Sequence, residues 1–111
     1  MGGGPPLDIR IEYVVRVLVT GQGDLRRMVR RLAEDWPDEP ALDLIHVIAV
    51  ATGSLEGTLA GRAIMRTTRE AWRMAALVGV DLAMMRRLGL SHGTGADLLA
   101  YWKAHDRFFL D

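Results

Sequence analysis

Apolar residues recur along most of this chain at intervals of three and four, which is the spacing of an amphipathic helix. The pattern is clearest in residues 24–35, where arginines occupy the opposite face. The apolar positions of this segment are Leu25, Met28, Val29 and Leu32. Asp24 stands at the N-cap position, and Trp36 precedes Pro37, which disfavours further helix. We therefore expect a helix over residues 24–35.

The first apolar segment, residues 7–20, fits two kinds of secondary structure. The alternation of a half-buried strand is present at Ile9, Ile11, Tyr13, Val15, Val17 and Val19. A helical stripe is formed by Leu7, Ile11, Val14, Val15 and Leu18, with Asp8 as the N-cap. We favour the helix because the later patterns are helical. If residues 8–20 and 44–52 were strands, the fold would instead be α/β.

Two long helices are expected in the middle of the chain. The first begins at about Ala41, after a proline of the kind favoured in first turns, and reaches Gly53, where we expect a bend or break. Ser54 would then cap a second helix through about Val78. One face of that helix is made of small and apolar residues, namely Ala60, Ile64, Thr67, Ala71, Ala75 and Val78.

Two shorter helices are expected after Gly79, which is a natural helix end. Asp81 would cap the first of them, and Thr94 with Asp97 has the spacing of a capping box that opens the last. The sequence therefore predicts an all-α fold, a small compact bundle of about five helices. Residues 1–6 would be a flexible tail and residues 7–111 a single helical domain.

The composition is that of a globular protein, since 50% of the 111 residues are hydrophobic and 25% are charged. A formal net charge of zero argues against a generally basic nucleic-acid-binding protein. The charges are nevertheless segregated along the chain. Residues 36–61 carry four acidic side chains and no Lys or Arg, whereas residues 62–87 carry six arginines and two acidic side chains.

The chain has no cysteine, which excludes disulfides and thiolate metal sites. No signal-peptide pattern is visible, and the apolar run at residues 44–55 is short for a membrane span. We therefore expect a cytoplasmic protein that does not enter a membrane. His46, His92 and His105 lie far apart and form no metal-ligand motif, so we expect no metal, no cofactor and no enzymatic activity.

Four arginines in the second long helix form the most distinctive charged feature. Arg62, Arg66, Arg69 and Arg73 are spaced four, three and four residues apart, and so follow one helix edge for about 16 Å. Such a row would bind phosphates or an acidic protein surface. The alternative is a solvated face, partly neutralised by Glu70 and by the acidic segment 38–56.

Three glycines and three aromatic residues are candidates for self-association. Gly53, Gly57 and Gly61 repeat every fourth residue, which indicates close approach of another backbone, either within the chain or from a second copy. The aromatic candidates are Trp102, Phe108 and Phe109. Their helix and tail would dock on the core, or, where exposed, would form a dimer contact.

Residues 71–90 also have the spacing of a helix-turn-helix, with Gly79 as the turn glycine. In this spacing the segment resembles the bacterial DNA-binding helix-turn-helix. The resemblance covers about 20 residues and implies that Arg86 and Arg87 lie near bases, with arginines of the preceding helix near phosphates. A second resemblance, of residues 21–26 to a Rossmann glycine turn, lacks its third glycine because Arg26 stands there.

We therefore expect a non-enzymatic helical interaction or regulatory module. It would form a homo-oligomer, most simply a dimer, and bind an anionic protein or nucleic acid through its arginines. The residues expected to bind that partner are Arg62, Arg66, Arg69, Arg73, Arg86 and Arg87. The alternative function is that of a helix-turn-helix DNA-binding transcriptional regulator.

Overall fold

The computed structural model describes residues 5–21, 24–58 and 61–111. Within these ranges the chain forms five helices and no strand, with a single isolated bridge between Pro40 and Thr94. The helices are α1 (Pro5–Thr20), α2 (Leu25–Asp35), α3 (Leu42–Thr58), α4 (Arg62–Arg87) and α5 (Gly95–Ala104). The predicted all-α bundle is confirmed, and the α/β alternative is wrong.

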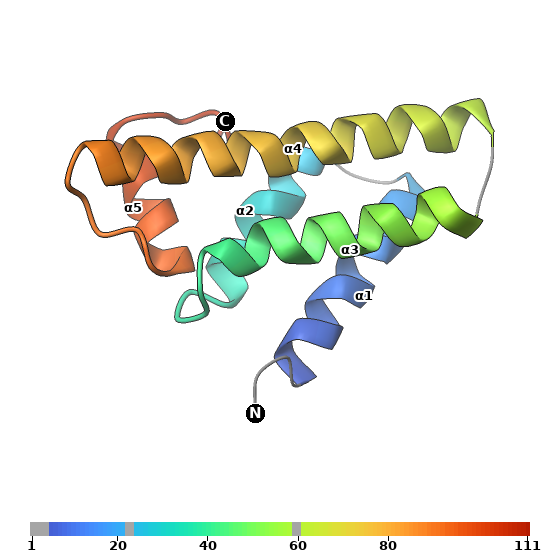
Figure 1. The fold of residues 1–111 in the computed structure, drawn as a ribbon, viewed down its shortest axis with the longest axis horizontal. Helices are drawn as coiled ribbons and strands as arrows, with labels where there is room; N and C mark the ends of the chain where they lie inside the picture. The colour runs from blue at the N-terminus through green and yellow to red at the C-terminus, as the bar shows by residue number, and fades with distance from the viewer. Residues whose placement is uncertain (1–4, 22–23, 59–60) are drawn as a thin grey trace.

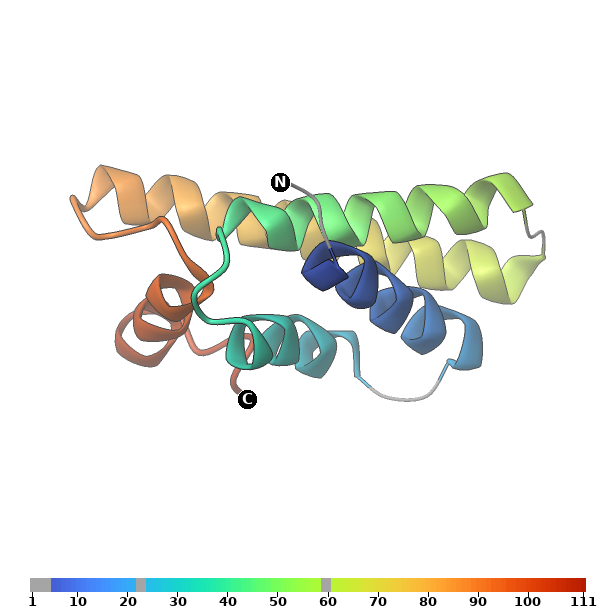
Figure 2. The same ribbon diagram turned by 90° about the horizontal axis from the view of Figure 1, so that it is seen from below.

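The helices are arranged in two layers. The long helices α3 and α4 run antiparallel, side by side, and form the first layer (Figure 1). Helices α1, α2 and α5 all lie on one face of that pair, as Figure 2 shows from a direction at right angles. The core therefore lies between the layers, and within the described ranges no helix covers the opposite face of the α3–α4 pair.

Helix α1 confirms the helical interpretation of the first apolar segment, because Val14 and Leu18 are buried in the core. It begins at Pro5, so the predicted tail over residues 1–6 is too long by two residues, and the first four lie outside the described ranges. Proline is tolerated here because the first amides of a helix have no partner within it. Asp8 consequently lies in the first turn and is not the N-cap.

The two glycine breaks expected in the long helices are wrong. Helix α3 continues through Gly53 and Ser54 to Thr58, and α4 continues through Gly79 to Arg87. The actual break precedes α4, where Gly61 has a φ of +126° that other residues rarely adopt. A glycine costs a helix about 1 kcal/mol, which is less than the burial of the apolar side chains on either side contributes.

An unbroken inner seam of buried residues explains the length of α4. These residues recur at spacings of three and four, and they are Thr68, Ala71, Ala75, Val78, Leu82 and Met85. The seam keeps one side of α4 against the core over its whole buried length. Asp81 therefore does not cap a separate short helix but lies within α4.

Asp81 joins α4 to α5 through a buried hydrogen bond. Trp102 is fully buried, and its Nε1 donates to Asp81 Oδ2 at 2.9 Å. Burial raises the pKa of Asp81, the hydrogen bond from Trp102 lowers it, and the charge of Asp106 raises it, so that the pKa lies above its ordinary value. Burial of the charged carboxylate at the α4–α5 contact is therefore electrostatically unfavourable.

Two of the predicted helix caps, Asp24 and Thr94, are confirmed, whereas Ser54 and Asp81 lie inside helices. Asp24 Oδ1 accepts from the amide of Arg26 at 2.9 Å, and Thr94 with Asp97 forms a complete capping box at the start of α5. Gly95, the residue after this cap, packs closely against the end of α2. A Cβ added at Gly95 would lie 3.1 Å from the carbonyl oxygen of Trp36. These contacts set where α2 begins and where α5 meets it.

Replacing Asp81 tests the electrostatic cost of the α4–α5 contact. Because its pKa is raised on folding, the parent loses stability from this group as the pH rises above the ordinary carboxyl range, about pH 4, and through the raised pKa. Asp81→Asn keeps an acceptor for Trp102 but does not titrate. The free energy of unfolding is measured with urea as a function of pH. We expect it to decrease less with rising pH in the variant than in the parent. A larger fall in the variant would contradict burial as the cause.

Candidate functional site

The uncovered face of the α3–α4 pair carries several large apolar side chains. We call this surface the outer face. Placing the residues of both helices at 100° intervals assigns to it Leu42 and Val50 from α3, and Met65, Trp72 and Val80 from α4. These five side chains are between 39% and 69% exposed. Single exposed apolar residues are ordinary, but several on one face mark an interaction surface.

Three contacts establish how α3 and α4 are aligned beneath this face. Trp72 Nε1 donates to Glu56 Oε2 at 3.0 Å, and a Cβ added at Gly79 would lie 3.7 Å from Ile45 Cδ1. At the other end, Leu42 and Ala83 line one hollow. The resulting antiparallel alignment places the small residues of the two helices opposite each other in the middle of the outer face. Those residues are Ala49 and Gly53 of α3 and Ala76 of α4.

A hollow lies at each end of this row of small residues. The hollow beside the α3–α4 connection has a volume of about 420 Å³ and is lined by Glu56, Ile64, Met65, Thr68, Arg69 and Trp72. The one at the opposite end has a volume of about 400 Å³ and is lined by Pro40, Leu42, Leu82, Ala83, Arg86, His92 and Gly93. Each hollow is lined by apolar side chains and by one arginine. This lining would fit a partner with apolar anchors and acidic side chains.

The four arginines of the predicted stripe are all exposed on α4, at the edge of the outer face away from α3. Arg73 pairs with Glu70 at 3.6 Å. For the other three, Arg62, Arg66 and Arg69, no carboxylate within the described part of the chain forms an ion pair. Arg86 and Arg87 are exposed at the far end of the same helix.

Two carboxylates of the acidic segment expected to neutralise the stripe have other partners. Asp43 pairs with the buried Arg10 of α1 at 3.1 Å, and Glu56 accepts the hydrogen bond from Trp72. The guanidinium of Arg10 also lies 5.9 Å from the ring centroid of Trp36. Of the expected partners, only Glu70 contacts the stripe. Among the described residues, most of the positive charge of the stripe is therefore not paired with a carboxylate.

The glycines do not serve close packing within the chain, so that interpretation is wrong. Gly53 and Gly57 are exposed, and a Cβ added at either would meet no atom of the described residues within 4 Å. Gly61 is explained by its positive φ at the start of α4. Two glycines of a long helix thus face open space at the outer face, where alanine would give the isolated chain a more stable helix.

The aromatic C-terminal segment docks on the core, as the first of its two interpretations predicts. Trp102 and Phe109 are 0% and 2% exposed, and their ring centroids are 4.8 Å apart. Phe108 is half-buried beneath the guanidinium of Arg26, which lies 5.2 Å from its ring centroid. The folded chain therefore does not present Trp102 or Phe109 to a second copy.

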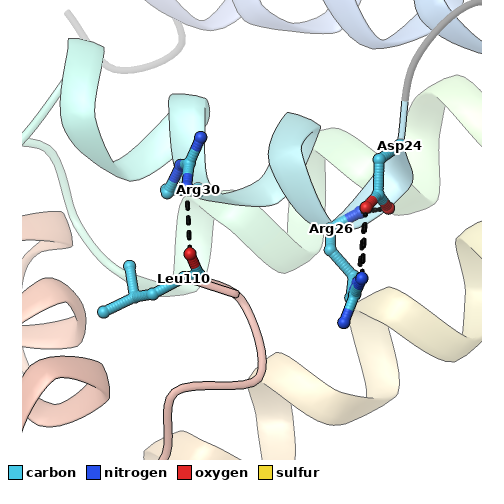
Figure 3. A network of polar contacts seen from close by, with 4 residues as sticks. All are labelled: Asp24, Arg26, Arg30 and Leu110. Atoms are coloured by element: carbon cyan, nitrogen blue, oxygen red, sulfur yellow. Dashed lines mark hydrogen bonds and ion pairs between the residues drawn. The ribbon is translucent and has the colours of Figure 1, made fainter.

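Two arginines of α2 hold this segment in place. Arg30 Nη1 donates to the backbone oxygen of Leu110 at 3.2 Å, and Arg26 is oriented by a hydrogen bond from its Nε to Asp24 Oδ2 at 3.4 Å. Figure 3 shows both arginines projecting from α2, with Leu110 reaching back to Arg30. The C-terminal segment is thus tied to the second layer, away from the outer face.

The helix-turn-helix expected at residues 71–90 is not formed. Residues 71–87 belong to one uninterrupted helix, so Gly79 makes no turn and no second helix is available to enter a DNA groove. The Rossmann resemblance at residues 21–26 also has no structural basis, because the segments on either side of it are helices.

Sequence reasoning found the arginines and the glycines of the outer face but not its large apolar residues. Their signal is a second stripe on α4, at Met65, Trp72, Ala76, Val80 and Ala83, on the side opposite the inner seam. Both stripes have helical spacing. A sequence alone does not say which of two such stripes faces the core.

No family model, curated protein or solved structure matches this chain. Over the described ranges, no group of three or more His, Cys, Asp or Glu side chains is placed to hold a metal ion. In the same part of the chain, no helix combines the length and the apolar character needed to cross a bilayer.

The exposure of the stripe predicts that its arginines contribute little to folding. Arg66→Gln combined with Arg69→Gln should change the free energy of unfolding by less than about 0.5 kcal/mol, measured by urea unfolding of dilute protein. The matched control is Arg10→Gln, which removes a buried and paired guanidinium and should cost about 2 kcal/mol or more. A double variant as unstable as the control would contradict this assignment.

Proposed function

We propose that this protein is a non-enzymatic interaction module that self-associates through the outer face. The observation that carries the proposal is the grouping of five exposed large apolar side chains on a face that no helix in the described part of the chain covers. Burying such side chains against a second copy would remove their apolar surface from water. The predicted cytoplasmic location stays part of this proposal.

The outer face is large enough for a specific contact. Helix α3 has 17 residues, and a helix of that length extends about 25 Å. Two neighbouring helices of ordinary diameter make the face about 20 Å wide, or roughly 500 Å² in projection. A pair of copies would therefore bury about 1,000 Å², which is the size at which specific protein interfaces begin.

The small residues along the middle of the face support the same function. Gly53, Gly57 and Ala76 leave the helix backbones accessible, so that a helix of a second copy approaches more closely than it would over large side chains. Close backbone approach increases van der Waals contact along the helices. Self-association therefore gives a physical reason for glycines that the isolated chain does not need.

We propose a second function for the arginine stripe, the binding of an acidic protein segment. Arg62, Arg66 and Arg69 offer exposed guanidinium groups without carboxylate partners among the residues that the structure describes. Planar guanidinium groups bind carboxylates in bidentate geometry. An acidic segment is favoured over DNA because the chain has no net charge and α4 lacks the turn of a helix-turn-helix.

Substitution of Gly53 tests self-association. We expect light scattering at high micromolar concentration to return a dimer for the parent, and a Kd at least tenfold weaker for Gly53→Leu. The added side chain points into open space in the single chain, so the fold tolerates it, but it prevents close approach of a second copy. The matched control is Ala96→Leu, at an exposed position of α5 outside the outer face, which should leave the dimer intact. A monomeric parent would remove the proposed function.

Two anionic probes test the second function. In fluorescence anisotropy at low salt, the parent should bind a labelled poly-glutamate peptide, and the triple variant Arg62→Gln, Arg66→Gln, Arg69→Gln should bind it at least tenfold more weakly. Tighter binding of a random DNA duplex, with affinity falling steeply as salt rises, would favour the DNA-binding regulator instead. Binding of neither probe would show that the stripe is a solvated face.

A further inference from the structure

The two helices of the outer face differ in their charged side chains. Helix α3 contains Asp43 and Glu56 and no Lys or Arg, and Asp38 and Glu39 come just before it. Helix α4 contains six arginines, four near its start and two at its end, against Glu70 and Asp81. Asp81 is buried beneath the face and does not reduce its charge. Asp43 is paired with Arg10 of α1, so α3 presents Glu56 and no basic side chain on the outer face, whereas α4 presents a row of arginines.

Two arrangements with twofold symmetry would bring two outer faces together. If the twofold axis lies in the interface and runs parallel to the helices, α3 of each copy lies over α4 of the other. If the axis is perpendicular to the helices, α3 lies over α3 and α4 over α4. The two arrangements bury similar apolar surface, so their difference in free energy comes mainly from the charges.

Charge repulsion disfavours the perpendicular arrangement. Stacking α4 on an antiparallel α4 places the arginines near its start, such as Arg66, over Arg86 and Arg87 of the second copy. Like charges brought together at an interface oppose binding and select against that partner orientation. The parallel axis instead places α3 of each copy, which has no Lys or Arg, over α4 of the other, so that the two rows of arginines lie apart.

We propose that two copies form an antiparallel four-helix arrangement in which α3 of each packs over α4 of the other. This inference rests on the proposed self-association and specifies its geometry. The axis parallel to the helices preserves the alignment seen within one chain, where Glu56 reaches Trp72. Glu56 of the second copy then lies near Arg69.

The same geometry accommodates Trp72, the aromatic side chain of the outer face. Trp72 is 39% exposed, and the alignment brings Gly53 and Gly57 of the second copy over it. The absence of side chains at these glycines leaves room for the indole ring. Trp72 therefore acts as the apolar anchor of the contact, and the two glycines form the space that receives it.

Engineered cysteines distinguish the two arrangements, because the chain contains no cysteine of its own. Ala49 and Ala76 lie at the same level on neighbouring helices, at the middle of the outer face. In the proposed dimer, Ala49 of one copy lies over Ala76 of the other, within the Cα separation of a disulfide, which is about 4.4–6.8 Å. Ala49→Cys and Ala76→Cys are therefore prepared as separate proteins.

We expect a disulfide-linked dimer on a non-reducing gel only when the two variants are mixed and mildly oxidised. Its yield should exceed that of mixtures containing Ala104→Cys, an exposed control in α5, by at least tenfold. Cross-linking of Ala76→Cys with itself, and none specific to the mixture, would overturn the geometry. Light scattering of the reduced variants separates the two proposals, because a monomer would remove self-association itself, whereas a dimer with the wrong cross-links removes only this arrangement.

Discussion

The structure depends on the packing of α3 against α4, and above all on the inner seam of α4. The seam is continuous from Thr68 to Met85, and it holds α4 straight past a glycine that would otherwise end a helix. Helices α1, α2 and α5 dock on the same side of the pair. Trp102 links this second layer to the seam by its hydrogen bond to Asp81.

The outer face follows from this one-sided packing. All covering helices and the C-terminal segment lie on the inner side, where Arg30 and Arg26 tie that segment to α2. The opposite side of α4 nevertheless has a second stripe with large apolar members, including Trp72 and Val80. A helix with apolar residues on two sides needs two partners, and the described part of the chain packs against only one of these sides. The second partner proposed here is another copy.

Local signals in the sequence predicted the helix ends that depend on neighbouring residues. Asp24 and the Thr94–Asp97 pair act through hydrogen bonds to amides two or three residues away, so their roles are readable from spacing alone. The breaks at Gly53 and Gly79 were wrongly predicted because burial elsewhere in each helix outweighs the local cost of glycine. Asp81 resembled a cap, but its partner Trp102 is 21 residues away and only the fold brings them together.

The candidate surface was predictable in its charges and not in its apolar part. Exposure of Arg62, Arg66, Arg69 and Arg73 followed from their separation from the apolar stripe of the same helix. Assigning Gly53 and Gly57 to the surface required knowing that nothing packs over them, which depends on how α3 is oriented. For Trp102 and Phe109, the sequence allows either a position in the core or a dimer contact. The structure shows that both side chains lie in the core.

The methionines allow the most direct test of the claim that the outer face is a contact surface. Met65 lies on that face and is 59% exposed, whereas Met28, Met74 and Met85 are buried in the core. With ¹³C-labelled methionine methyl groups, NMR spectra are recorded as the protein concentration rises from low to high micromolar. We predict that the chemical shift of Met65 changes with protein concentration, whereas the chemical shifts of the three buried methionines do not change. A Met65 signal that stays constant over the whole range would contradict that claim.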